Sequence, residues 1–310
     1  GVGAEMLVNG ASRLALRLGV TPLVVGLTIV AFATSAPELA VSVDATLNGL
    51  SGLALGNVVG SNIANIGLIL GITAIINPIN IQHEVVRKQI PIMIGCSVVM
   101  GLLVLDGEIS RIDGILLVLG LIVYTYLSYR QVAKEEDQGD PGMVPLIGNR
   151  ESPAIAKKHT GRTLLHVVLV IAGLGFLIAG SQVFVNNTIT LARALGISEA
   201  IIGLTLVAVG TSVPELATSV AAALRKQADI AIGNVVGSNI FNILSVLGIT
   251  GIVGTIYADQ FSLVDFGVMM IFALVLLPIA RSGLVLSRFE GALLLTGYAG
   301  YIGYLGTTAA

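Results

Sequence analysis

Long apolar stretches separated by short polar ones run along most of the chain. A membrane-spanning helix needs about 20 predominantly apolar residues, and the pattern predicts ten such segments. Their expected ranges are 1–18, 22–47, 52–77, 86–105, 112–130, 162–194, 200–224, 229–255, 261–280 and 287–307. Outer-membrane strands are excluded, because polar and apolar residues alternate along them. The pattern therefore predicts an all-α integral membrane protein with ten transmembrane helices.

A single long polar segment, residues 132–161, divides these helices into two sets of five. We expect residues 1–131 and 162–310 to form two five-helix units joined by this linker. Its acidic run (Glu135, Glu136 and Asp137) lacks the ligand spacing of a calcium-binding loop, so we interpret it as part of a solvated linker.

The two units carry a repeated sequence. GNVVGSNI occurs at 56–63 and again at 233–240, and residues 26–43 match 203–220 at 13 of 18 positions with the same offset of 177. At this offset Gly1 aligns with Ile178, inside the sixth predicted helix. We therefore expect the first helix to be truncated at its N-terminus in this chain.

The basic residues predict the orientation of the helices. If the first helix runs from outside to inside, 14 of the 16 lysines and arginines fall on the inner side, and only Arg111 and Arg193 fall outside. Basic residues concentrate on the cytoplasmic side of membrane proteins. Because five is an odd number, the second unit then enters the membrane from the opposite side, as an inverted repeat. We expect a cell-membrane protein with both termini extracellular and the linker cytoplasmic.

Composition excludes several classes of function. The chain is 55% hydrophobic and 11% charged, with a net charge of −2, and it has no basic cluster for nucleic acid. One cysteine and three histidines, with no cluster among them, do not suggest a zinc or copper site. We find no nucleotide-binding motif and expect neither an enzyme nor a bound cofactor.

The second predicted helix carries a polar face within apolar sequence. Thr34, Ser35, Glu38 and Ser42 recur at helical spacing. Pro37 should break the helix and free backbone oxygens around Ala31 to Thr34, which a bound cation would satisfy. The seventh helix repeats this arrangement with Ala208, Thr211, Ser212, Pro214, Glu215 and Ser219. A glutamate inside a membrane helix costs about 3 kcal/mol, so two at equivalent positions favour a functional site over a structural role.

The third and eighth helices each add a second polar face. Asn57, Ser61 and Asn65 are four residues apart, whereas Asn62 is expected to point elsewhere. The equivalent residues are Asn234, Ser238, Asn242 and Asn239. An asparagine in a membrane helix also commonly just bonds a neighbouring helix, so a structural role for Asn57 and Asn234 stays open. All the ligand atoms that these residues offer to a cation are oxygens, which suit Ca²⁺ or Na⁺.

These motifs resemble those of the calcium/cation antiporter superfamily, and within it the sodium/calcium exchangers. The family's repeats read G-T-S-x-P-E and G-[NS]-x-x-G-S-x-x-x-[ND]; this chain has ATSAPE (33–38) with GNVVGSNIAN (56–65), and GTSVPE (210–215) with GNVVGSNIFN (233–242). The match covers both repeats, and the short linker resembles that of prokaryotic members.

The resemblance implies roles for twelve residues. Glu38 and Glu215 would be the central Ca²⁺ ligands, with the backbone oxygens of Thr34 and Thr211. The implied Na⁺ ligands are the hydroxyls of Ser35, Ser61, Ser212 and Ser238, the threonine hydroxyls and the carbonyls of Ala31 and Ala208. Asn65 and Asn242 would complete the site on its inner side. Transport would proceed by alternating access, with the first and sixth helices sliding against the core.

Two positions depart from the family pattern. Ala33 replaces a motif glycine, and Asn242 stands where some relatives, including potassium-dependent exchangers, have aspartate. The second departure argues against potassium dependence and leaves the coupling ion open. We expect exchange of Ca²⁺ for Na⁺ by a monomer in the lipid bilayer. A Ca²⁺/H⁺ antiporter with the same glutamates is the alternative, and a cation channel is a more distant one.

Overall fold

A computed structural model describes residues 2–18, 21–137, 168–173, 175–176, 178–179, 197–258 and 262–308. These residues are mainly helical. The long or peripheral helices are α1 (Val2–Leu18), α7 (Ile90–Leu103), α8 (Arg111–Asp137), α15 (Leu263–Arg281) and α16 (Arg288–Thr308). The remaining elements of the first half are α2 (Pro22–Val25), η1 (Gly26–Val30), α3 (Ala31–Thr34), α4 (Ala36–Leu47), α5 (Ser51–Ala64), η2 (Asn65–Leu70), α6 (Gly71–Ile76), β1 (Ile79–Asn80), η3 (Val85–Gln89), η4 (Val104–Asp106) and β2 (Glu108–Ile109).

The second half repeats this series at the sequence offset of 177. Its elements are α10 (Glu199–Ile202), η6 (Gly203–Val207), α11 (Ala208–Thr211), α12 (Val213–Leu224), α13 (Ala228–Phe241), η7 (Asn242–Leu247), α14 (Gly248–Val253), β3 (Ile256–Tyr257) and β4 (Val285–Leu286). Every boundary from α2 to β1 recurs from α10 to β3 at this offset. The sequence duplication is therefore also a duplication of structure, down to the wide π-helical turns η1, η2, η6 and η7.

Within the described residues, six helical stretches are long and apolar enough to cross a membrane. They are Pro22–Leu47, Ser51–Ile76, Val85–Asp106, Arg111–Ser128, Ala228–Val253 and Leu263–Arg281. The stretch Glu199–Leu224 becomes a seventh if its two parts, which meet at 42°, form one span. Helices α1 and α16 also form where spans were expected, but they are not among the six.

Two predicted segments lie partly outside the residues that the structure describes. Most of the predicted sixth helix, and the linker after Asp137, lie outside the described residues. The predicted count of ten spans therefore stays a prediction. Helix α8 continues to Asp137, so the acidic run expected in the linker belongs to the end of this helix.

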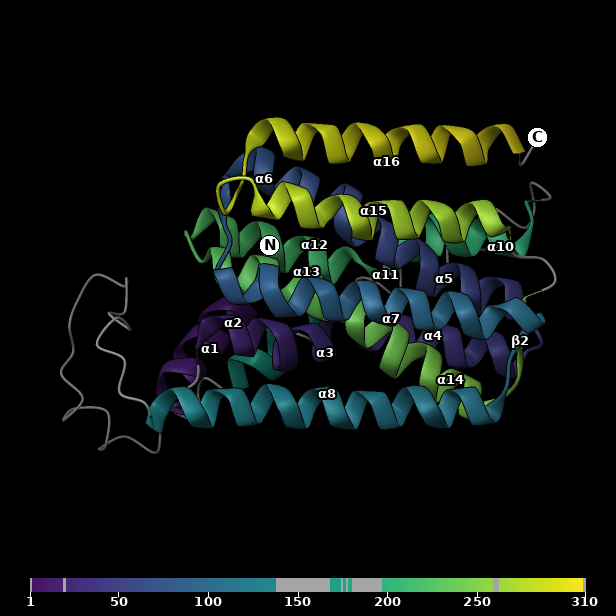
Figure 1. Ribbon diagram of the computed structural model, residues 1–310, viewed down its shortest axis with the longest axis horizontal. Coiled ribbons are helices and arrows are strands. Elements are labelled where there is room, and N and C mark those ends of the chain that lie inside the picture. Colours follow the sequence, from purple (N-terminus) through teal and green to yellow (C-terminus); the bar gives the residue numbers. More distant parts are fainter. Residues whose placement is uncertain are drawn as a thin grey trace.

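The two most buried spans lie at the centre of the molecule. In an apolar 18-residue stretch of Ala228–Val253, 89% is buried, and the corresponding share is 78% for Ser51–Ile76 but only 22% for Arg111–Ser128. Figure 1 shows α8 and α16 along opposite edges, with α5 and α13 between them. The outer helices expose large apolar side chains such as Leu116, Ile122 and Ile271, as expected of surfaces that face lipid.

Glycines allow the central helices to approach their neighbours closely. A Cβ atom at Gly60 of α5 would lie 2.5 Å from the Leu204 carbonyl oxygen of η6 and 2.7 Å from Ala208 Cβ. The equivalent atom at Gly237 of α13 would lie 2.7 Å from the Leu27 carbonyl oxygen of η1. Small residues at such crossings bring membrane helices into backbone contact. Each repeat thus packs its central helix against the broken span of the other repeat.

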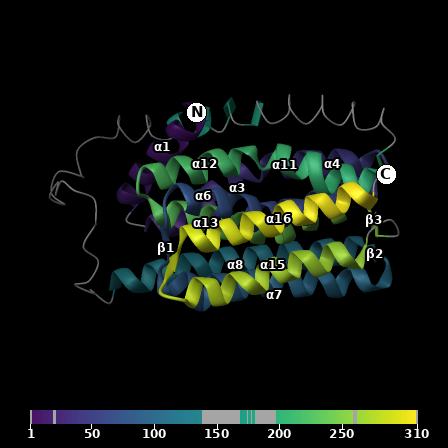
Figure 2. The ribbon, with the colours of Figure 1, turned by 90° about the horizontal axis from the view of Figure 1, so that it is seen from above.

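Two short antiparallel ladders also join the repeats. β1 pairs with β4, and β2 pairs with β3, so each ladder takes one strand from each half. β1 lies at one end of the molecule, whereas β2 and β3 lie at the other (Figure 2). Equivalent segments of the two halves, such as β1 and β3, therefore lie at opposite ends.

Candidate cation site

The site forms where the broken spans meet. Helix α3 ends at Thr34 and α4 begins at Ala36, so Ser35 lies between them with non-helical backbone angles (φ −79°, ψ 4°). Pro37 sits in the first turn of α4, where its missing N–H is not needed. Glu38 follows one residue later and is fully buried. The second repeat breaks in the same way at Ser212, one turn before the buried Glu215.

The two glutamates are bound crosswise by serines of the opposite repeat. Ser212 Oγ donates to Glu38 Oε1 over 3.1 Å, and Ser35 Oγ donates to Glu215 Oε1 over 3.4 Å. Ser238 Oγ also donates to Glu215 Oε1 over 3.4 Å. Ser35 and Ser212 each stand three residues before the glutamate of their own repeat. The structure thus brings both carboxylates to the junction of the repeats.

Several buried oxygens at this junction have no hydrogen-bond partner in the described part of the chain. The unpartnered oxygens are Oε2 of both glutamates, Oγ of Ser61, and Oδ1 of Asn65 and Asn242. Unpaired buried oxygens are costly in a protein interior. A cation at the junction would satisfy them.

A second set of crosswise bonds fixes the threonines. Thr34 Oγ1 donates to Asn234 Oδ1, and Thr211 Oγ1 donates to Asn57 Oδ1, each over 3.1 Å. Asn57 in turn donates to the Glu38 carbonyl oxygen over 3.1 Å, and Asn234 does the same for Glu215 over 3.3 Å. These two asparagines tie four spans together and hold the glutamate backbones in place.

The carbonyls of Ala31 and Ala208 are not freed as the sequence suggested. Ala31 O accepts from Ser35 N over 3.0 Å, and Ala208 O accepts from Ser212 N over 3.1 Å, so both keep a backbone bond. Each also lies 3.3 Å from the hydroxyl of its neighbouring threonine, Thr34 or Thr211. A hydroxyl has only one proton, and here it is donated over the shorter distance of 3.1 Å to an asparagine oxygen. Each alanine carbonyl oxygen therefore keeps one lone pair available for a cation.

Asn65 and Asn242 lie one helical turn beyond Ser61 and Ser238 and are fully buried. Asn65 Nδ2 donates to Asn239 Oδ1 over 2.9 Å, and Asn242 Nδ2 donates to Asn62 Oδ1 over 3.1 Å. The expectation that Asn62 points elsewhere was therefore incomplete. It points away from its own repeat's polar face and toward Asn242 of the other repeat.

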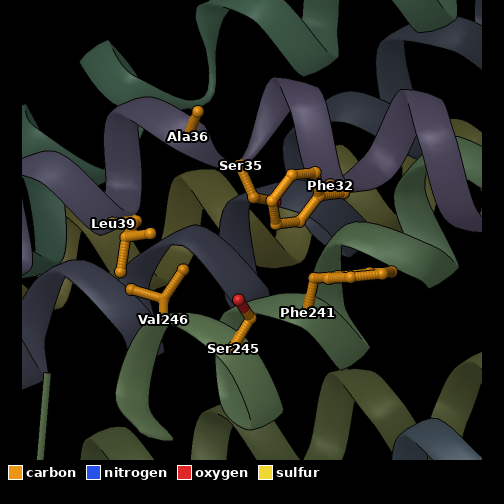
Figure 3. A pocket seen from close by; sticks show the side chains of 7 residues that line it. All are labelled: Phe32, Ser35, Ala36, Leu39, Phe241, Ser245 and Val246. Carbon is orange, nitrogen blue, oxygen red and sulfur yellow. The ribbon is translucent and has the colours of Figure 1, made fainter. Parts of the chain in front are cut away.

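A small cavity of about 20 Å³ lies beside the junction, between the α3–α4 break and the start of η7. It is lined by Phe32, Ser35, Ala36, Leu39, Phe241, Ser245 and Val246. Ser35, which donates to Glu215, forms part of its wall, and the Ser245 hydroxyl points toward it (Figure 3). The Phe32 and Phe241 rings are 5.7 Å apart. Their repeat equivalents are Val209 and Ala64, so this side of the site differs between the repeats.

The chemistry of the site is that of oxygen ligands around two carboxylates. Within the described residues, no three histidine, cysteine, aspartate or glutamate side chains gather as a metal-binding group. The other polar groups around the two carboxylates are neutral hydroxyl, amide and carbonyl oxygens. Such a set suits hard cations, and two ionised carboxylates balance one divalent ion.

Comparison with known proteins identifies the family. Residues 1–130 and 165–306 match the sodium/calcium exchanger protein family. The chain belongs to this family. The sodium/calcium exchanger MaX1 of Methanosarcina acetivorans is 33% identical over 97% of this exchanger and 93% of that protein. The putative antiporter CaxA of Alkalimonas amylolytica is 36% identical over 96% of this exchanger and 92% of that protein.

Solved structures agree with this assignment. A structure of the sodium–calcium exchanger NCX_Mj, soaked with Na⁺ and Ca²⁺, superimposes on this exchanger with a TM-score of 0.78 and 33% sequence identity. The superposition covers 97% of this chain and 92% of that one. The family resemblance inferred from the two motif pairs is confirmed, and with it an antiporter fold of membrane-spanning helices.

Proposed function

We propose that this exchanger is a secondary antiporter that moves Ca²⁺ against Na⁺ through the junction of its two repeats. The observation that carries the proposal is the crosswise pair of buried glutamates, each with one unpartnered oxygen. A divalent cation between the two carboxylates offsets their mutual repulsion. Several monovalent ions spread over the same oxygens offset it equally well, so the two kinds of ion compete for one site.

The proposed ligands fall into two groups. Glu38 and Glu215 bind Ca²⁺ with the backbone oxygens of Thr34 and Thr211. Na⁺ takes the oxygens around them: the hydroxyls of Ser35, Ser61, Ser212 and Ser238, the threonine hydroxyls, one lone pair each from Ala31 and Ala208, and the amide oxygens of Asn65 and Asn242. The eight hydroxyl and amide side chains, all of them buried, support this division, because uncharged oxygen ligands suit a monovalent ion.

The architecture we propose is ten helices in two inverted five-helix repeats, in the cell membrane, with both termini outside and the linker in the cytoplasm. The placement of β1 and β3 at opposite ends supports the inversion (Figure 2). In an inverted repeat, exchanging the conformations of the two halves turns an outward-open site into an inward-open one. The first and sixth helices would slide against the core in this exchange, and a monomer would suffice.

Transport into vesicles of purified protein tests the proposal. We expect uptake of radioactive Ca²⁺ when Na⁺ is loaded inside and diluted outside, and none when K⁺ replaces Na⁺. Uptake driven by a pH gradient without Na⁺ would assign the coupling to protons on the glutamates instead. An absence of Ca²⁺ uptake under either gradient, with protein correctly reconstituted, would contradict the antiport function.

A further inference from the structure

Four buried asparagines are linked by hydrogen bonds in a chain beside the two glutamates. Asn65 donates to Asn239, and Asn242 donates to Asn62, so each bond crosses from one repeat to the other. Asn239 Nδ2 also lies 3.5 Å from the Asn62 carbonyl oxygen. All four side chains are at most 2% exposed. The family motif includes Asn65 and Asn242, whereas Asn62 and Asn239 stand outside the ligand set proposed above.

The direction of these bonds decides which atom Asn65 and Asn242 present to a cation. An amide carries an oxygen acceptor on one side and an NH₂ donor on the other. Because the NH₂ group of Asn242 is held by Asn62, its Oδ1 atom is turned away from Asn62 and has no partner within the described chain. The same holds for Asn65 and its donor bond to Asn239. The reverse orientation would direct a donor at the cation and repel it.

Two methionines from the outer helices set the orientation of Asn62 and Asn239. Asn62 Nδ2 donates to Met269 Sδ of α15 over 3.8 Å, and Asn239 Nδ2 donates to Met93 Sδ of α7 over 3.4 Å. A thioether sulfur accepts hydrogen bonds but cannot donate them. It therefore selects the amide orientation in which NH₂ faces the sulfur and the carbonyl oxygen faces the opposite repeat.

We infer that Asn62 and Asn239 are positioning residues, each of which holds the amide oxygen of Asn242 or Asn65 toward the transported cation. The chain of contacts runs from a methionine, through the positioning asparagine, to the asparagine at the site. This inference rests on the proposed cation site. It adds that the outer helices α7 and α15 act on cation affinity without touching the ion.

Binding of radioactive Ca²⁺ to the purified full-length protein in detergent tests the inference independently of the coupling ion. We expect Asn62→Leu, which keeps the branching of the side chain but removes the acceptor, to weaken Ca²⁺ binding about 10-fold, as loss of a residue that orients a metal ligand commonly does. Thr73→Val is the matched control. Thr73 is a buried polar residue of α6 on the same span, and its replacement should leave the Kd for Ca²⁺ unchanged.

A second variant separates positioning from general damage. Both oxygens of a carboxylate accept, so Asn242→Asp has no wrong orientation for Asn62 to prevent. We expect Asn62→Leu to change the Ca²⁺ Kd less than twofold in the Asn242→Asp background. An equal loss in both backgrounds, or none in either, would overturn the inference. The Asn239→Leu and Asn65→Asp pair repeats the test in the other half.

A conservative substitution covers the case in which Asn62→Leu does not fold. Met269→Leu keeps the packing volume and costs little stability, but it removes the acceptor that selects the Asn62 orientation. We expect a weaker loss of Ca²⁺ affinity in the same direction, again suppressed by Asn242→Asp. An unchanged Kd in Met269→Leu would then overturn the inference. If the wild-type protein binds no Ca²⁺, the cation site itself fails, which is a different result from a wild-type site that ignores residue 62.

Discussion

At the scale of single residues, the main feature is a pair of carboxylates buried in apolar surroundings. Glu38 and Glu215 have fully buried side chains, and each has one oxygen on a serine of the other repeat and one without a partner in the described chain. Charged groups persist in such places when a counter-charge joins them. If the proposed cation supplies that counter-charge, removing either carboxylate should mainly weaken cation binding.

Glutamine substitutions measure that dependence. We expect Glu38→Gln or Glu215→Gln to abolish Ca²⁺ uptake in vesicles. Bound Ca²⁺ would keep one uncompensated positive charge, and an uncompensated buried charge costs about 3 kcal/mol or more, over 100-fold in affinity. The variants should still purify as folded protein, since glutamine keeps the shape and the acceptor oxygen. Asp44→Asn is the matched control, since Asp44 is an exposed carboxylate on the same helix. Normal uptake by both glutamine variants would refute the site assignment.

Close packing of helices without intervening side chains decides the position of the site at the scale of elements. Each central helix, α5 or α13, lies against the wide turn of the opposite repeat, η6 or η1, at Gly60 or Gly237. This contact sets the distance over which serine and threonine side chains reach the glutamate and asparagine of the other half. Any added side-chain volume at these glycines must push the repeats apart.

Alanine at Gly60 tests this role. Its Cβ would lie 2.5 Å from a backbone oxygen that cannot move aside, so we expect a loss of about 1–3 kcal/mol in stability together with weaker Ca²⁺ binding. The buried single cysteine, Cys96, provides the readout, because a thiol-reactive dye labels it as the protein unfolds on heating. Gly300→Ala in α16, where a Cβ meets nothing within 4 Å, should unfold at the wild-type temperature. Equal unfolding temperatures for the two variants would contradict the packing argument.

At the scale of the whole molecule, the main feature is that two equivalent halves are joined by contacts between them. Element boundaries repeat at an offset of 177, and each β-ladder joins one half to the other. The serine–glutamate hydrogen bonds of the site also join the halves, except for the bond from Ser238 to Glu215. The inverted topology that we propose would place equivalent residues on opposite sides of the membrane. Arg111 and Arg288 are one such pair, and both are exposed at the start of a long helix.

Cysteine labelling of that pair tests the inversion. In right-side-out membranes we expect Arg111→Cys to react with an impermeant maleimide, and Arg288→Cys to react only after the membrane is opened. The unsubstituted protein, whose one cysteine is buried, is the blank. Reaction of both variants from the same side would rule out the inverted arrangement, whereas reversed sides would keep the inversion and correct the predicted orientation.

Much of the fold could be read from the chain because its signals are local. The length of the apolar stretches predicted the spans, including the central pair 52–77 and 229–255, which the structure has at Ser51–Ile76 and Ala228–Val253. The duplicated strings at 56–63 and 233–240 predicted the repeat, and the prolines predicted helix breaks, which occur at Ser35 and Ser212. The wide turns such as η1 were not predicted, because they lie inside an apolar stretch that the length rule assigns to one continuous helix.

The sequence by itself determined which residues form membrane helices and which polar groups they carry, because hydrophobic length, helical spacing and duplication are properties of the linear chain. The tertiary structure alone decided the partners. Ser35 bonds Glu215 rather than Glu38, and Asn62 accepts from Asn242. These pairings depend on which helix faces cross at close range. That is set by packing between segments 180 residues apart, which no local pattern encodes.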